Sequence, residues 1–206
     1  MQTFLLLCCL ARRVAEDETC TLKLERLVLP TPLAESPASG WSIEFDASIY
    51  GGGSVLKDAD GTIREYFAVV WDESDPPRRS HVVLWSSAHQ SFWEFCTLLL
   101  SLCTWGDRFT AETVSILGDK PSALQNALSF KGRGPLMDVA RELSWRQART
   151  GWKFQVGHLP SEFNVVADAL SRTADPDKSA WPSEALAAAL PAKPPRLCSL
   201  WRAAPV

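Results

Sequence analysis

The sequence predicts an α/β domain over residues 41–172, in which a five-stranded mixed sheet is flanked by helices. The first observation behind this prediction is the spacing of the apolar residues. The spacing changes from every second residue, as in strands, to every third or fourth, as in helices, and later changes back. The connections predict it second: the early strands follow one another through short turns, and the later strands are joined through helices. Because short turns give antiparallel pairing and helical connections favour parallel pairing, we expect a mixed sheet.

Three antiparallel strands are expected first. Residues 41–48 alternate between apolar and polar side chains, which is typical of a strand with one buried face. The glycines at 51–53 allow a tight passage into a second strand at 54–57. The Asp-Gly pair at 60–61 then indicates a hairpin turn before a third strand at 62–71.

Helices and strands alternate in the second half. After a loop at 72–79, apolar residues from Phe92 to Cys103 recur at helical spacing, and Ser86 or Ser87 is expected to cap this helix. The other expected elements are a strand at 113–117, helices at 121–129 and 135–149, a strand at 152–159 and a short helix at 164–171.

The two ends of the chain are expected to lie outside this domain. Residues 1–40 lack sustained periodicity, so we interpret them as a leader or as the end of an upstream domain. Residues 173–206 are rich in proline and alanine, which predicts a mobile tail with at most one short helix, at 183–190.

The N-terminus and the cysteines favour an intracellular protein, cytoplasmic or nuclear, over a secreted one. An apolar run at 4–10 is too short to span a bilayer, and its basic residues follow it, whereas in a secretory signal they precede it. We therefore expect no membrane partner. The cysteines form no CxxC pair and have no histidine at zinc-ligand spacing, so neither a zinc site nor a redox motif is indicated; they are Cys8, Cys9, Cys20, Cys96, Cys103 and Cys198.

The charge distribution offers one local surface for nucleic acid. The net charge of -3 excludes a general attraction to polyanions. Between Lys131 and Lys153, however, basic residues outnumber acidic ones along a mostly helical pattern. This segment is either a nucleic-acid-binding surface or simply a solvated helix face.

Four carboxylates are candidates for a metal site: Asp46 on the first strand, Glu94 in the first helix, Asp119 after the fourth strand and Asp168 in the last helix. If the first and fourth strands are neighbours, Asp46 and Asp119 lie side by side. Clustered carboxylates repel one another, so such a cluster is tolerated chiefly around a divalent cation. Oxygen ligands favour Mg²⁺ or Mn²⁺, and two such ions can support in-line cleavage of a phosphodiester.

Four segments resemble the ribonuclease H domain of retroelement polyproteins. They are Phe45-Asp46-Ala47-Ser48, Trp93-Glu94, Gly118-Asp119 and His158-Leu-Pro-Ser-Glu-Phe-Asn164-Val-Val-Ala-Asp168-Ala-Leu-Ser-Arg172. The last is the most specific, because retroelement domains of this family end in such a pattern. The resemblance covers residues 41–172, the same unit that the periodicity defines.

The resemblance implies a fold, a reaction and roles for individual residues. The fold would be the ribonuclease H-like mixed sheet, and the reaction would be hydrolysis of the RNA strand of RNA–DNA hybrids with two Mg²⁺ or Mn²⁺ ions. Asp46, Glu94, Asp119 and Asp168 would be the catalytic metal ligands, and His158, in a loop, would assist water entry or product release. The nucleic acid is one implied partner, and the reverse transcriptase part of a parent polyprotein is another.

Simpler interpretations exist for each residue and for the whole chain. Taken alone, Asp46 can be a turn former, Asp119 or Asn164 a helix cap, and His158 a surface residue. Another ribonuclease H-like nuclease, such as an exonuclease or an integrase, fits the fold but not the Ala-Asp-Ala-Leu-Ser-Arg ending. No reverse transcriptase signature occurs in the first 40 residues, so the chain is either a polyprotein fragment or a relic. A catalytically inactive relic would bind nucleic acid, or act as a scaffold, without cutting it.

Overall fold

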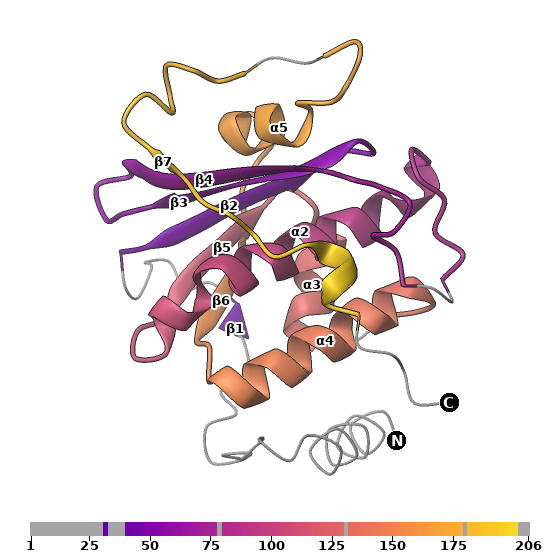
Figure 1. The fold of residues 1–206 in the computed structure, drawn as a ribbon. Coiled ribbons are helices and arrows are strands. Elements are labelled where there is room, and N and C mark those ends of the chain that lie inside the picture. The colour runs from indigo at the N-terminus through magenta and orange to yellow at the C-terminus, as the bar shows by residue number, and fades with distance from the viewer. Residues whose placement is uncertain (1–30, 33–39, 78–79, 130–131, 179–180, 202–206) are drawn as a thin grey trace.

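The computed structural model describes residues 31–32, 40–77, 80–129, 132–178 and 181–201 (Figure 1). Its strands are β1 (Thr31–Pro32), β2 (Ser42–Ala47), β3 (Gly51–Lys57), β4 (Ile63–Val70), β5 (Val114–Gly118), β6 (Phe154–His158) and β7 (Leu190–Pro191). Its α-helices are α2 (Gln90–Trp105), α3 (Pro121–Ser129), α4 (Pro135–Thr150) and α5 (Val165–Ser171). Short 3₁₀ helices lie at Ser87–His89 (η2), Gly106–Phe109 (η3) and Leu197–Ser199 (η4).

The sheet is mixed, with the strand order β1-β6-β5-β2-β3-β4-β7. The β2, β3 and β4 strands pair antiparallel, whereas β5 pairs parallel with β2 and with β6. The predicted mixed α/β sheet flanked by helices is therefore confirmed. The strand count differs from the predicted five, because two-residue strands, β1 and β7, lie at the two edges of the seven-stranded sheet. Both belong to segments whose composition predicts no strand.

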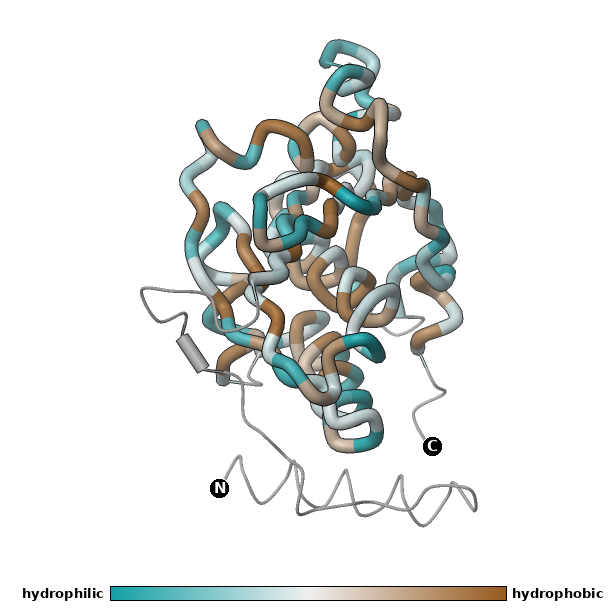
Figure 2. Tube along the Cα trace, turned by 90° about the vertical axis from the view of Figure 1, so that its left-hand side faces the viewer, coloured by the Kyte–Doolittle hydropathy of each residue, from teal (hydrophilic) through white to brown (hydrophobic). Residues whose placement is uncertain are grey.

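Helices cover the two faces of the sheet unequally. In Figure 1, α2, α3 and α4 lie on one side of the sheet, and α5 lies alone on the other. The main core fills the space between the sheet and α2, with fully buried side chains such as Phe45, Trp93 and Leu99. Figure 2 shows many of the hydrophobic segments gathered in the interior of the described part of the chain. No helix within the described ranges combines the length and the apolar character needed to cross a bilayer.

The glycines at 51–53 belong to β3 itself, whereas the sequence predicts only a passage before the strand. Helix α5 and the side chains of the main core press directly against this part of β3. A Cβ on Gly53 would lie 2.5 Å from the Ala167 carbonyl oxygen, and one on Gly52 would lie 2.5 Å from the Thr97 hydroxyl oxygen. The glycines therefore allow close packing on both faces of the strand.

The C-terminal segment packs on the domain, which differs from the predicted mobile tail. Its residues 183–188, where at most one short helix is predicted, form turns, and β7 pairs with β4. Leu197 and Leu200 are buried in the main core, and the Trp201 indole donates a hydrogen bond to the Asp75 carbonyl. The apolar residues dispersed between the prolines therefore bind the segment to the sheet edge, an arrangement that periodicity does not reveal. The boundary at residue 172 stays a prediction.

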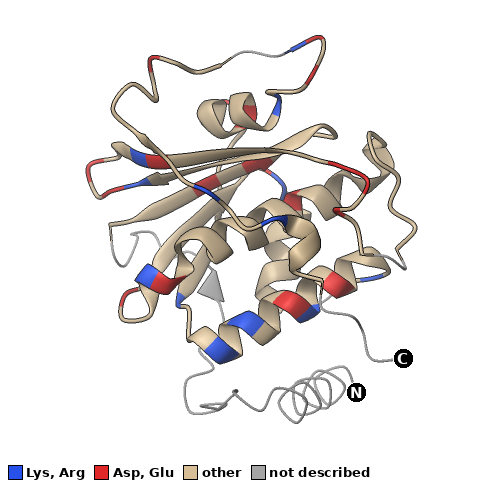
Figure 3. Ribbon diagram, in the orientation of Figure 1, with Lys and Arg blue, Asp and Glu red and all other residues tan. Residues whose placement is uncertain are grey.

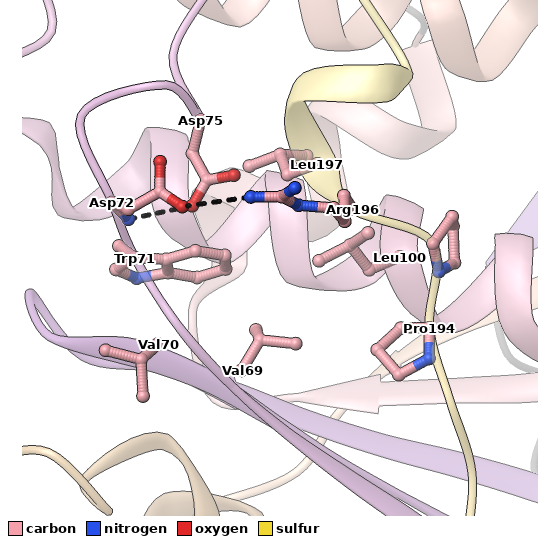
Figure 4. A pocket seen from close by; sticks show the side chains of 10 residues that line it. Val69, Val70, Trp71, Asp72, Asp75, Leu100, Pro194, Arg196 and Leu197 are labelled. Carbon is pink, nitrogen blue, oxygen red and sulfur yellow. Dashed lines mark hydrogen bonds and ion pairs between the residues drawn. The ribbon is translucent and has the colours of Figure 1, made fainter.

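A cavity of about 190 Å³ lies between this segment and the end of β4 (Figure 4). Val69, Trp71, Leu100 and Pro194 are among the residues that line it. At its rim, the Arg196 guanidinium points toward the Asp72 carboxylate at 3.9 Å. None of the four candidate acids is among the described residues that line this cavity.

Replacement of Gly53 by alanine tests the close approach of α5 to β3. Because the new methyl group meets the backbone of α5, we expect Gly53→Ala to lower the free energy of unfolding by about 1–3 kcal/mol. Urea unfolding measures the effect, with Thr62→Ala at an exposed position as the control. An unchanged midpoint for Gly53→Ala would contradict this packing.

Replacement of Leu200 tests whether the C-terminal segment belongs to the core. Leu200 is 2% exposed, so Leu200→Ala should cost about 2–5 kcal/mol of unfolding free energy by removing buried methyl groups. The exposed Lys193→Ala on the same segment is the matched control and should change stability little. Equal stability of the two variants would indicate a segment that does not contribute to folding.

Candidate metal centre

Three of the four candidate acids converge on one point. Asp46 lies in β2, Glu94 in α2 and Asp119 directly after β5, and each offers a carboxylate oxygen within 4.8 Å of the others. The parallel pairing of β2 with β5 brings Asp46 and Asp119 together, because its register ends with Glu44 opposite Leu117, two residues before each acid. The expected proximity of these three acids is present. Their role as metal ligands stays a prediction.

Asp168 lies at the rim of this group, beside Asp46. Its side chain is within hydrogen-bonding reach of the Asp46 carboxyl, and its charge acts on that carboxyl. One of its oxygens accepts a hydrogen bond from the Arg172 Nε at 2.7 Å, and its side chain is 45% exposed. Asp168 therefore borders the three-acid group without joining it in this geometry.

Burial and mutual repulsion make two of the acids, Asp46 and Glu94, reluctant to ionise. Asp46 is 4% exposed and Glu94 is fully buried. Burial, together with the charge of Asp119, raises the pKa of Asp46 to about 7. Burial and the charge of Asp46 likewise raise the pKa of Glu94 well above its usual range. A divalent cation would remove this penalty, because it stabilises the ionised carboxylates.

Each of the three acids has one oxygen that a neighbouring side chain holds. Ser171 Oγ donates to Asp46 Oδ2 at 3.0 Å, Gln90 Nε2 to Glu94 Oε1 at 2.9 Å, and Ser161 Oγ and Lys120 Nζ to Asp119 Oδ2 at 2.9 and 3.3 Å. Partial burial on its own would lower the pKa of the Lys120 ammonium. The charge of Asp119 and the hydrogen bond to Asp119 outweigh the effect of burial, so the pKa of Lys120 is raised.

Opposite these anchored oxygens, two carboxylate oxygens are left without a partner. Glu94 Oε2 and Asp119 Oδ1 are buried and accept no hydrogen bond from the part of the chain that the structure describes. Buried polar atoms usually have a hydrogen-bond partner, so two buried acceptors without one in a single acidic group indicate a binding site for a ligand. Oxygen donors of this kind suit Mg²⁺ or Mn²⁺. The residues present therefore fit the metal that the resemblance implies.

The segment between β6 and α5 is fixed to the same end of the sheet. The Asn164 amide donates to the carbonyl oxygen of Phe45, the residue before Asp46, at 2.9 Å. Asn164 thereby ties the start of α5, and with it Asp168, to β2. Its other side-chain atom, Oδ1, is buried without a partner among the residues described.

His158 lies in a strand, in agreement with the strand predicted at 152–159, whereas the resemblance implies a loop position. It is the last residue of β6 and pairs in register with Gly118, the residue before Asp119. Parallel pairing with β5 continues to this position and so extends the strand. The side chain is exposed and lies at the same end of the sheet as the acids.

Sequence reasoning missed the side chains that hold the acids: Gln90, Lys120, Ser161 and Ser171. A signal existed for Gln90, which precedes Glu94 by four residues and therefore shares its helix face. Ser161 and Ser171 belong to the His158–Arg172 segment, but nothing in their spacing indicates a contact with the acids, since serine is common in loops and at helix ends. The expected cap of α2 also differs: Ser86 caps η2, which leads into α2, by accepting a hydrogen bond from the Ala88 amide.

The basic segment Lys131–Lys153 is partly neutralised by its own acids. Arg146 pairs with Glu142 at 2.8 Å, and Arg141 lies 3.6 Å from Asp138. Figure 3 shows acidic and basic segments distributed along α4. Lys131 lies outside the described residues. Use of this segment for nucleic-acid binding stays a prediction.

No family model and no curated protein matches the chain. Among solved structures, it is similar to RNase H1 from the archaeon Halobacterium salinarum NRC-1, with 22% identity over 66% of this chain and 98% of the other, at a TM-score of 0.48. LC11-RNase H1 in complex with an RNA/DNA hybrid shares 17% identity over 63% of this chain and 92% of the other, with a TM-score of 0.49. The N-terminal RNase H domain of Rv2228c from Mycobacterium tuberculosis shares 16% identity over 63% of this chain and 94% of the other, with a TM-score of 0.42.

The fold is ribonuclease H-like. The mixed sheet flanked by helices agrees with the fold that the sequence resemblance implies. The solved structures are similar to this chain only at low sequence identity, so the reactions of those proteins are not assigned to this chain.

The raised pKa of Asp46 makes the metal-free protein sensitive to pH. The folded protein binds this proton more tightly than the unfolded chain, where the carboxyl has its ordinary pKa of 3.8. The stability that the proton contributes is complete below about pH 4 and is lost as the pH rises to about 7. In EDTA at pH 8 we therefore expect Asp46→Asn to be more stable than the unchanged protein, on the order of 1–3 kcal/mol.

Urea unfolding in EDTA at pH 4 and pH 8 measures this difference. At the lower pH the unchanged carboxyl is protonated, so the two proteins should be similar. Asp60→Asn, at an exposed turn position, is the control. If the difference in unfolding free energy between Asp46→Asn and the unchanged protein is equal at both pH values, or larger at pH 4, the charge of Asp46 does not destabilise the fold.

Proposed function

We propose that this protein is a metal-dependent endonuclease of retroelement origin that hydrolyses the RNA strand of RNA–DNA hybrids. The observation that carries the proposal is the group of three acids at one end of a ribonuclease H-like sheet, in which Asp46 and Glu94 are buried and Glu94 and Asp119 each have an orphaned oxygen. The retroelement origin and the hybrid substrate rest on the sequence pattern from His158 to Arg172, which is the most specific part of the resemblance.

In this proposal Asp46, Glu94 and Asp119 hold the divalent ions, and Asp168 approaches from the rim. Bound ions would supply an activated water and charge stabilisation at the leaving oxygen. Gln90, Ser161 and Ser171 orient the carboxylates by binding one oxygen of each, which leaves the other oxygen for a ligand. Such anchoring keeps the ligand geometry fixed before the substrate arrives.

His158 and the loop after it complete the proposed site. His158 is exposed at the end of β6, next to the strand that leads to Asp119, so its imidazole is accessible to water at the same end of the sheet as the acids, where it would assist water entry or product release. The ribose 2′-hydroxyl is the group that would distinguish the RNA strand from the DNA strand. The reverse transcriptase part of a parent polyprotein is the proposed protein partner.

Cleavage of a labelled RNA–DNA hybrid tests the proposal directly. With Mg²⁺ or Mn²⁺ we expect the RNA strand of the hybrid to be cut, and single-stranded RNA and duplex RNA to be left intact. Because Asp119 offers a ligand oxygen, Asp119→Asn should lower the rate at least roughly 100-fold, whereas the exposed Asp60→Asn should not.

The result separates the nuclease from an inactive relic. Salt-sensitive binding of the hybrid, without cutting by folded protein at any metal concentration, would reject the nuclease and leave a nucleic-acid-binding remnant. Cutting of single-stranded or duplex RNA at a comparable rate would reject hybrid specificity while keeping the metal-dependent chemistry.

A further inference from the structure

A lysine lies against the acidic group. Lys120 follows Asp119 directly and precedes the first residue of α3. Its ammonium nitrogen is 3.3 Å from Asp119 Oδ2, and the charges of Glu94 and Asp46 act on it as well. The Lys120 side chain is 45% exposed, while that of Asp119 is 9% exposed. The partly exposed ammonium is therefore in contact with a carboxylate that is largely buried.

Among the basic side chains in the described ranges, Lys120 and Arg172 are the ones placed at these acids. Arg172 is engaged at the rim, where it binds Asp168 at 2.7 Å and lies 3.8 Å from Asp175. Lys120 instead contacts Asp119, one of the three converging acids, and the charges of the other two act on it. A cation at this position offsets part of the repulsion among the three carboxylates.

We propose that Lys120 is a tethered counter-cation of the acidic group that competes with the entering divalent ion and so sets the metal concentration that the site requires. The inference rests on the proposed function, because it assumes that the three acids bind the ion. Asp119 connects the two cations: its Oδ2 holds Lys120, and its orphaned Oδ1 is free for the metal. Two cations on one carboxylate repel each other, so metal binding must either displace the ammonium or bear its repulsion.

The opposite role would give the opposite sign. If Lys120 served only to orient Asp119, its removal would loosen the carboxylate and weaken metal binding. If it is a competing cation, its removal strengthens metal binding. For a unit charge several ångströms from a divalent ion near the protein surface, Coulomb's law gives a change of roughly three- to thirty-fold in affinity.

Calorimetric titration of the full chain with Mg²⁺ alone, without nucleic acid, tests the proposal. The variants are Lys120→Met, which keeps the length of the side chain but removes its charge, and Lys120→Arg, which keeps the charge. Lys153→Met makes the same charge change at the start of β6, the end of that strand opposite to the acids. We expect Lys120→Met to bind Mg²⁺ roughly three- to thirty-fold more tightly, and the other two variants to bind like the unchanged protein.

Equal or weaker Mg²⁺ binding by Lys120→Met would overturn the proposal, as would an equal gain in Lys153→Met, which would reflect net charge only. In cleavage assays, the Mg²⁺ concentration for half-maximal rate should fall by the same factor in Lys120→Met, a shift that a merely structural role would not produce. If neither the unchanged protein nor Lys120→Met binds Mg²⁺, the metal-dependent function fails together with this inference. If both bind alike, the inference alone fails.

Discussion

The parallel pairing of β2 with β5 is the constraint on which the candidate site depends. Asp46 and Asp119 are far apart in the chain, and only the register of this pairing brings their carboxylates to the same end of two adjacent strands. Glu94 joins them because α2 packs across β2 and β3 with its apolar residues in the core. The core therefore supplies the free energy that holds three mutually repelling carboxylates together.

The side chains around these carboxylates orient some of the carboxylate oxygens and leave others available to bind a ligand. Serine and amide side chains hold one oxygen of each acid, and orphaned buried oxygens remain on Glu94 and Asp119. Full satisfaction of the acids by hydrogen bonds would stabilise the metal-free fold but would leave nothing for a ligand. The observed arrangement sacrifices some stability at neutral pH for an oriented set of oxygen donors.

Two packing features keep the fourth acid and the sheet edge in place. The glycines of β3 let α5 approach the sheet closely enough for Asp168 to reach Asp46, and Asn164 fixes the start of that helix to β2. On the far edge, the C-terminal segment pairs with β4 and inserts Leu197 and Leu200 into the core. An edge that is paired in this way offers fewer free backbone groups for unwanted association.

The sequence by itself determined the fold class and nearly all the long elements, because apolar periodicity is local and records which face of each element is buried. It also determined the candidate acids, since their motif residues are contiguous in the chain. The tertiary structure alone decided which of them converge: Asp46, Glu94 and Asp119 meet, and Asp168 stays at the rim. It likewise decided the roles of Lys120 and Ser161 at Asp119, and it placed the C-terminal segment on the sheet edge. These features depend on contacts between residues that are distant in the chain or carry no pattern, and single-sequence periodicity holds no information about such contacts.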